Sequence, residues 1–332
     1  MTDEEYCRLA AEIPGPGNSE AEGVYPADSS VNRYGKLQVK GVQLCDEDGN
    51  PVQLKGLFLR SLGGEAKFLN DDCFDTFVHD WKIDIIRIPF MSAQWYTDPP
   101  YINEPRYERL VDKAVALSEK YGIYCIIDWH VLGDRNPFRY AKEALEFFSR
   151  FSYKYGAKKH VIYEICNEPN GKYVTWDDVI KPYAGLLVPA IRTADPEALV
   201  IVGTSTWSQD VDIAAENPLT FPNVLYAFHF YSGSNRARLR DRIEAASYKI
   251  PLFCSEWGNS NCFARNGPYK KESARWLDMM DSRKIGWCHF SISDTPVEAS
   301  IFKPDAKTDG TWTDADLTAS GKYIIAVLRN QS

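Results

Sequence analysis

The chain has 332 residues, 44% of them hydrophobic, which is enough to bury one large core or two modest ones. Its formal charge of −8 argues against a nucleic-acid partner, because a phosphate-binding surface needs clustered Lys and Arg and the sequence has no such run. No stretch approaches the roughly 18 to 20 apolar residues that span a bilayer, so no membrane partner is expected.

The first part of the chain has the composition of a linker. Residues 1–30 are rich in Gly, Pro, Ser and acidic side chains without a clear period, which predicts a leader or linker-like segment. The start, "MTDEEYCRLA", lacks the basic-then-apolar order of a secretory signal. We expect residues 31–332 to form a single domain.

A short β-hairpin is predicted at the beginning of this domain. The stretch "KLQVKGVQLCDEDGNPVQLKG" alternates in character on either side of Asp48-Gly49-Asn50, which is typical of a hairpin turn. We expect the hairpin to cap one end of the structure that follows.

The rest of the domain alternates short apolar runs with amphipathic segments. Apolar residues three or four apart predict helices in segments such as "RYERLVDKAVALSEKYG" and "RYAKEALEFFSRFSYKYG". Eight βα units in about 300 residues favour an α/β fold, the (β/α)₈ TIM barrel, with a doubly wound open sheet as the alternative. The predicted strands lie near residues 53–59, 84–89, 123–129, 161–166, 199–203, 224–230, 251–256 and 286–292.

Polar side chains end five of these predicted strands. Active sites of such barrels lie at the C-terminal ends of the strands, so these side chains are expected to converge. Two reactions could use them: glycoside hydrolysis by paired carboxylates, or hydrolysis at a metal ion. "DWH" fits metal spacing only loosely, and we predict no metal. The residues concerned are Arg87, Asp128, His130, Asn167, Glu168, His229, Tyr231 and Glu256.

The eight cysteines suggest no zinc site, because no CxxC pair is present. Three of them lie inside apolar strands and are expected to be free buried thiols: Cys125, Cys166 and Cys254. The better candidates for disulfides lie near loops or termini: Cys7, Cys45, Cys73 and Cys262.

Six motifs together resemble glycoside hydrolase family 5, within it the bacterial endoglucanase (cellulase) branch. They are "IIRIPF", "IIDWH", "IYEICNEPNG", "VGTSTWSQDVD", "AFHFYSG" and "FCSEWGNS", and the resemblance runs from about Val31 to Leu328. It implies that Glu168 is the acid/base, that Glu256 is the nucleophile and that no cofactor is needed. It also implies supporting positions for Arg87, His130, Asn167, His229 and Tyr231.

The resemblance implies a retaining endo-β-1,4-glucanase that works through a covalent glycosyl-enzyme intermediate. Alternatives are a related β-glycanase acting on mannan, xyloglucan or mixed-linkage glucan, or a non-catalytic carbohydrate-binding barrel. The expected partner is a β-glucan polysaccharide, and the expected state is a monomer that is secreted, periplasmic or on the cell surface. The implied substrate-binding residues are Trp207, Phe290, Asp294 and Glu298.

The sequence departs from the family pattern at two places. Phe290 stands where the branch usually has Trp, and His289 stands where Asn is common. The segment after the first strand, "LFLRSLGGEAKF", lacks the usual His and Trp. These changes leave the expected chemistry in place and concern substrate preference.

The roles implied by the resemblance set conditions on the pKa values of the two carboxyls. Glu168 has to hold a proton near neutral pH, and we expect an apolar wall and the charge of Glu256 to raise its pKa. Glu256 has to stay ionised, and Arg87 and the Tyr231 hydroxyl are suited to stabilise that anion.

Overall fold

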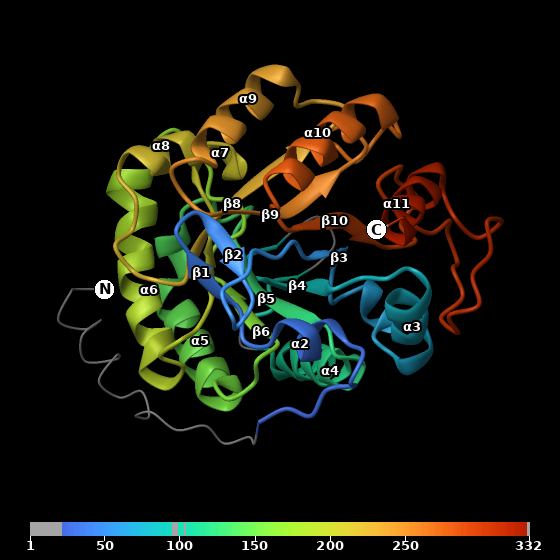
Figure 1. Cartoon of the computed structure of the whole chain (residues 1–332), viewed down its shortest axis with the longest axis horizontal. Coiled ribbons are helices and arrows are strands. Elements are labelled where there is room, and N and C mark those ends of the chain that lie inside the picture. Colours follow the sequence, from blue (N-terminus) through green and yellow to red (C-terminus); the bar gives the residue numbers. More distant parts are fainter. Residues whose placement is uncertain (1–21, 95–98, 103, 331–332) are drawn as a thin grey trace.

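Eight parallel strands close into a barrel in the computed structural model, which describes residues 22–94, 99–102 and 104–330 (Figure 1). The barrel order is β10-β3-β4-β5-β6-β7-β8-β9, so the last strand pairs with the first. The predicted (β/α)₈ barrel is confirmed, and each predicted strand overlaps an observed one. The strands are β3 (Lys55–Leu59), β4 (Ile85–Met91), β5 (Tyr124–His130), β6 (Val161–Glu164), β7 (Val200–Val202), β8 (Val224–Tyr231), β9 (Leu252–Gly258) and β10 (Trp287–Ile292).

Helices cover the outside of the barrel. The longer ones are amphipathic and turn their apolar residues toward the strands, as the spacing of those residues predicts. The helices are α2 (Ser30–Tyr34), α3 (Asp71–Asp75), α4 (Pro105–Tyr121), α5 (Ala141–Tyr155), α6 (Lys181–Ala194), α7 (Ser205–Ser208), α8 (Val211–Glu216), α9 (Ala237–Ala246), α10 (Lys270–Ser282) and α11 (Ala319–Arg329). Short 3₁₀ or π turns are η1 (Glu65–Phe68), η2 (Thr76–Asp80), η3 (Pro137–Tyr140) and η4 (Trp176–Ile180).

Alternation along the strands divides the buried residues into two clusters. One cluster fills the barrel and includes Phe58, Ile126 and Phe253. The other lies between the strands and the helices and includes Cys254 and Trp257, neighbours of Phe253 along the same strand. Because both faces of each strand are buried, the strands read as continuous apolar runs in the sequence.

The predicted hairpin is present and lies at the N-terminal end of the barrel. β1 (Gln38–Lys40) pairs antiparallel with β2 (Gln43–Cys45) across Gly41-Val42, so the predicted turn position is wrong. The turn at residues 46–50 follows β2 and closes a bridge between Cys45 and Pro51. Leu44 joins the cluster inside the barrel, and the hairpin therefore closes that end.

Most of the predicted leader lies outside the described residues, and so does Cys7. The described part of it packs on the barrel: the Tyr25 hydroxyl contacts His160 Nδ1 at 3.0 Å. In the part of the chain that the structure describes, no helix is both long and apolar enough to cross a membrane.

The remaining seven cysteines are free thiols. Cys45 and Cys73, expected as disulfide candidates, are instead buried, and their Sγ atoms donate to the carbonyl oxygens of Gln43 and Thr308. Cys262 is exposed and also unpaired. Cys125, Cys166 and Cys254 are buried free thiols as predicted.

Candidate active site

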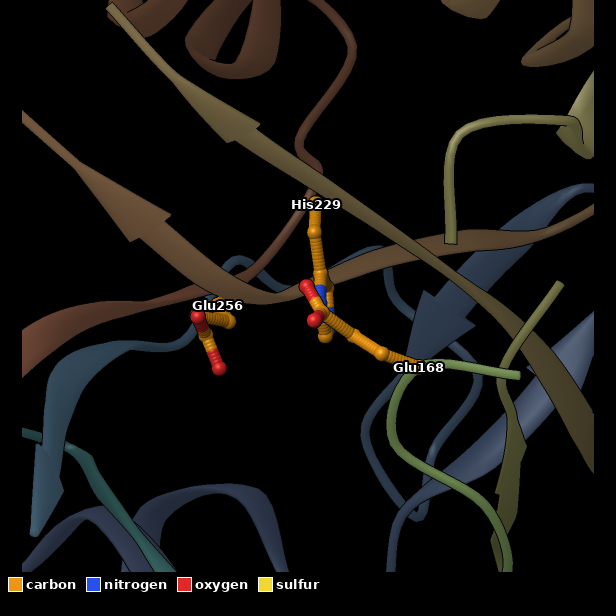
Figure 2. Close-up of side chains that lie close together, drawn as sticks. All are labelled: Glu168, His229 and Glu256. Atoms are coloured by element: carbon orange, nitrogen blue, oxygen red, sulfur yellow. The ribbon is translucent and has the colours of Figure 1, made fainter. Parts of the chain in front are cut away.

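Two carboxylates and an imidazole meet at the C-terminal end of the barrel. Glu168, from the loop after β6, lies beside His229 at the end of β8, with Glu256 of β9 next to both (Figure 2). One carboxylate oxygen of each Glu and one ring nitrogen of His229 all lie within 4.8 Å of one another. All three line a cleft of about 990 Å³.

Arg87 lies at the centre of the site and is fully buried. Glu164 accepts from it with both oxygens, at 2.7 Å from Nε and 3.0 Å from Nη2. Arg87 Nη1 donates to Glu256 at 3.2 Å, and the guanidinium lies 4.3 Å from the centre of the Phe58 ring. A bidentate pair of this kind fixes the plane of the guanidinium, so Arg87 directs one N–H toward Glu256.

Glu256 is held on both of its oxygens. Arg87 donates to Oε2, and the Tyr231 hydroxyl donates to Oε1 at 2.5 Å. Burial raises the pKa of the Glu256 carboxyl, and the positive charge of Arg87 opposes that rise. The two donors favour the ionised form of Glu256 because both hydrogen bonds are made to a carboxylate.

A chain of hydrogen bonds starting at Ser255 determines which nitrogen of His229 carries hydrogen. Ser255 Oγ donates to Glu164 Oε1 at 2.8 Å, so its single proton is used there. Ser255 Oγ also lies 2.8 Å from His229 Nε2, which therefore has to be the donor. Burial lowers the pKa of His229 to about 4, so the ring is neutral at pH 7 and has only this one N–H.

The same reasoning places a proton on Glu168. His229 Nδ1 then has a lone pair, and it lies 2.9 Å from Glu168 Oε1. Two acceptors do not form a hydrogen bond, so the Glu168 carboxyl is the donor. Its pKa agrees with this assignment: burial, reinforced by the charges of Asp128 and Glu164, raises it to about 7 against the opposing charge of Arg87.

Asn167 is fixed by three neighbours. Its Oδ1 accepts from Arg87 at 2.7 Å, and its Nδ2 donates to the carbonyl of Val131 at 3.1 Å. Nδ2 also lies 3.4 Å from His130 Nε2, while His130 Nδ1 contacts Asp128 at 2.7 Å. The amide is therefore held in one orientation, with its N–H₂ group directed at the Val131 carbonyl and the His130 ring.

The structure brings two of the four expected substrate-binding residues to the cleft. Trp207 lines it with 46% of its surface exposed, and Phe290 lines it beside Tyr231, with ring centres 6.2 Å apart. Asp294 instead pairs with Lys67 at 2.6 Å, and Glu298 is exposed outside the cleft. Residues Thr295 and Val297 line the cleft in this loop, because alternate residues of the loop face it.

His289 points away from the cleft. It lies in β10 between Cys288 and Phe290, which both face the barrel interior, so its ring enters the helix layer and packs edge-on against Trp257 at 4.7 Å. Burial lowers its pKa to about 3, so the ring is neutral. This departure from the family pattern is therefore a matter of packing and does not alter the cleft.

Ser255 is the residue that sequence reasoning missed. Strict alternation cannot send both Ser255 and Glu256 into the barrel, but the register of β8 and β9 shifts between Ala227 and His229. Cys254 and Trp257, on either side, both face the helices, so β9 presents two successive residues inward. A β-bulge of this kind leaves no sequence pattern to detect here.

Glu168, His229 and Glu256 are also the described residues whose atoms are close enough to share a metal ion. The hydrogen-bond pattern does not favour that use. Both nitrogens of His229 are already engaged, with Ser255 and with the proton of Glu168. Arg87 adds a positive charge at Glu256. The arrangement fits proton transfer better than metal binding.

Comparison with known proteins agrees with this geometry. Residues 45–296 match the family model described as cellulase (glycosyl hydrolase family 5). An endoglucanase of Clostridium saccharobutylicum is 42% identical over 307 residues, which cover 90% of this chain and 66% of that protein. The chain thus spans somewhat less than two thirds of that relative, and 58% of "Endoglucanase 5" of Pectobacterium carotovorum subsp. carotovorum.

Solved structures give the same result. A cellulase named Cel5C_n superimposes with a TM-score of 0.86 at 41% identity, covering 92% of this chain and 95% of that one. The catalytic domain of Thermobifida fusca endoglucanase Cel5A in complex with cellotetraose gives 0.83 at 35% identity, with 91% and 99% covered. The chain belongs to glycosyl hydrolase family 5, the cellulase family.

Proposed function

We propose that the chain is a retaining endo-β-1,4-glucanase. The observation that carries this proposal is the short separation of the Glu168 and Glu256 carboxylates, whose nearest oxygens lie within 4.8 Å. Retaining glycosidases place their two carboxyls about 5 Å apart, whereas inverting enzymes need room for a water molecule between them. The different partners of the two groups support different roles, as an acid and as a nucleophile.

In the first step, Glu256 Oε attacks the anomeric carbon while the glycosidic C–O bond breaks. Glu168 gives its proton to the leaving oxygen, and an ester joins Glu256 to the sugar. In the second step, the Glu168 carboxylate takes a proton from water, and the water oxygen attacks the anomeric carbon. The ester bond breaks, Glu256 leaves as a carboxylate and Glu168 is protonated again.

The surrounding residues support this cycle. Arg87 and Tyr231 stabilise Glu256 when it is ionised, before the attack and after the ester breaks. A sugar 2-hydroxyl would replace the longer contact of Asn167 with His130. Its hydrogen bond to Asn167 would strengthen as positive charge develops on the sugar. Trp207 offers its exposed face to a sugar ring.

We infer that the substrate is a β-glucan and that the enzyme works as a monomer outside the cytoplasm. Relatives named endoglucanases and a relative solved with cellotetraose support a β-1,4-glucan. A polysaccharide chain is too large to enter a cell, which favours a secreted, periplasmic or surface location. Phe290 stands where the family usually has Trp, and this departure concerns substrate preference. Mannan, xyloglucan and mixed-linkage glucan are therefore to be tested as substrates as well.

The proposal is tested by release of reducing ends from soluble carboxymethylcellulose, glucomannan, xyloglucan and mixed-linkage glucan. We expect activity on carboxymethylcellulose, with a fall in viscosity early in the reaction because internal bonds are cut. Activity on only one of the other glycans would be consistent with the proposed mechanism and would assign a different substrate. No activity on any of them would favour a carbohydrate-binding barrel.

The hydrogen bonds at His229 lead to a prediction for Ser255. In the native protein, kcat/KM should fall as pH rises through the pKa of Glu168, about 7. Ser255→Ala removes the acceptor of His229 Nε2–H, so the proton can move to Nδ1 and donate to ionised Glu168. The new hydrogen bond stabilises the ionised form of Glu168 and lowers its pKa. The basic limb of the pH profile, where kcat/KM falls as pH rises, should therefore move down by about one pH unit.

Ser255→Thr is the matched control, because it keeps the hydroxyl and should leave the basic limb near its native position. The measurement is kcat/KM for a soluble cello-oligosaccharide between pH 5 and about 9. A lower rate with an unmoved basic limb in Ser255→Ala would mean that Ser255 only packs against the site.

A further inference from the structure

Positive charge surrounds the reacting centre of the cleft. Within the described residues, the acidic side chains that line the cleft are Glu168 and Glu256, the two groups assigned to the reaction. The two histidines of the lining are neutral, because burial lowers their pKa values to about 4. The remaining charged residues of the lining are Arg60 and Arg265. A chain with a formal charge of −8 thus offers positive charge to a ligand in this cleft.

Both arginines belong to the same wall of the cleft. Arg265 lies in the loop after β9 and Arg60 directly follows β3, and these two strands flank β10 in the barrel. Backbone hydrogen bonds join both segments to β10 and the loop after it. Ala299 N donates to the Ala264 carbonyl, and Arg60 N donates to the Ile292 carbonyl, each at 3.2 Å. Three neighbouring segments therefore form one continuous wall.

The rim loop (residues 261–265) holds the backbone of Arg265 in place. Asn261 Oδ1 accepts from the backbone N–H groups of Phe263 and Arg265, each at 3.0 Å. Asn261 N in turn donates to the Arg265 carbonyl at 3.0 Å. The backbone that carries Arg265 is therefore ordered before a ligand binds, which reduces the entropic cost of binding.

The rim loop presents an aromatic ring and a cation to the cleft. Phe263 lines the cleft with 74% of its surface exposed. Arg265 is exposed as well, and its guanidinium forms no ion pair or hydrogen bond with the described residues. An aromatic face suits the apolar face of a sugar ring, and a guanidinium suits a carboxylate, which it can bind through two parallel hydrogen bonds.

Arg60 differs from Arg265 because it has an acidic partner. Its Nη1 lies 3.8 Å from Oε1 of Glu65, a carboxyl that is only 2% exposed. The same oxygen accepts from Ser293 Oγ at 2.7 Å and from Thr295 Oγ1 at 3.2 Å. Glu65 thereby ties Arg60 to the loop after β10 and offsets part of its charge. The net positive charge of this wall therefore comes from Arg265.

We propose that the rim loop selects β-1,4-glucans that carry a carboxylate, either on a substituent or at an oxidised C6 of glucose, with Arg265 as the specificity-determining residue. This proposal rests on the proposed function, because the glucan has to occupy the cleft to bring its carboxylate to the rim loop. Arg265 binds the carboxylate, and Phe263 packs against the sugar ring that carries it. Loss of Arg265 therefore reduces cleavage of an acidic glucan more than cleavage of a neutral one.

The test compares kcat/KM for carboxymethylcellulose and for neutral hydroxyethylcellulose, matched in chain length and degree of substitution. Arg265→Gln should lower the ratio of the acidic to the neutral substrate about threefold, as the loss of a partly exposed ion pair predicts. Arg265→Lys keeps the charge and should recover most of the ratio. Arg238→Gln is the matched control, because it removes the same charge from an exposed residue of α9 outside the cleft and should not change the ratio.

Cellulose partly oxidised at C6 serves as a second acidic substrate. A larger effect of Arg265→Gln on this polymer would place the recognised carboxylate on the glucose itself, and a larger effect on carboxymethylcellulose would place it on a substituent. An unchanged ratio for both acidic polymers, the same change in Arg238→Gln, or cleavage of the neutral polymer alone would overturn the proposal.

Cleavage of none of these polymers by native protein would instead mean that the proposed function fails. The selectivity is then decided by calorimetric titration of carboxymethylated and unmodified cellohexaose into protein carrying Glu256→Ala. Arg265→Gln in that background should weaken binding of the carboxymethylated sugar about threefold more than binding of the unmodified one. Equal weakening would overturn the proposal.

Discussion

Glu168→Gln should lower kcat/KM on cello-oligosaccharides by about 10³-fold while leaving a substrate with an activated leaving group much less affected. The new amide has nearly the shape of the carboxyl, and its N–H₂ can still donate to His229 Nδ1, so the site should keep its geometry. It cannot give a proton to a glucosyl oxygen. A dinitrophenolate leaves without a proton, so formation of the glycosyl-enzyme from dinitrophenyl cellobioside should remain fast.

The measurement is the ratio of the two rates in native and variant protein. Glu146→Gln makes the same chemical change in an exposed residue of α5 that pairs with Lys142, and it should alter neither rate. Equal losses on both substrates after Glu168→Gln would show that Glu168 is not the proton donor.

Glu256→Ala should abolish hydrolysis, with a loss of at least about 10⁴-fold, since no covalent intermediate can form. The shortened side chain leaves space beside Arg87 and Tyr231, two donors that then suit a small anion. Azide bound there should attack dinitrophenyl cellobioside from the face that Glu256 used. Direct displacement inverts the anomeric carbon, so the product should be the α-glycosyl azide.

Glu168→Gln supplies the matched comparison. In that variant azide has to attack the glycosyl-enzyme formed by Glu256, so the second inversion should give the β-glycosyl azide. The anomeric configuration of both products can be read by NMR. The same configuration from the two variants would contradict the assignment of acid and nucleophile.

The sequence was most informative where one physical rule acts alone. Strands buried on both faces have to be apolar, and all eight were found from that pattern. The hairpin was found as well, but its turn was misplaced, because the acidic Asp48-Gly49-Asn50 has stronger turn chemistry than Gly41-Val42, which the strands use.

Side-chain contacts between distant segments were the least predictable. The contact of Arg87 with Glu256 was expected, whereas its pairing with Asp128 and Glu164 depends on strands that meet only when the barrel closes. Ser255 could not be found, because the bulge in β9 breaks the alternation that would assign its direction. The disulfide candidates Cys45 and Cys73 were wrong, because a position near a loop in sequence does not determine whether a side chain is buried.

The free thiols have a practical consequence. Six of the seven described cysteines are buried, and Cys262 is exposed at the rim of the cleft. Once Cys7 has been replaced by Ser, a maleimide dye under native conditions should attach at a single place. The fluorophore would then lie at the rim of the cleft, where a bound polysaccharide changes its surroundings. Its fluorescence would therefore report substrate binding without the introduction of a new cysteine.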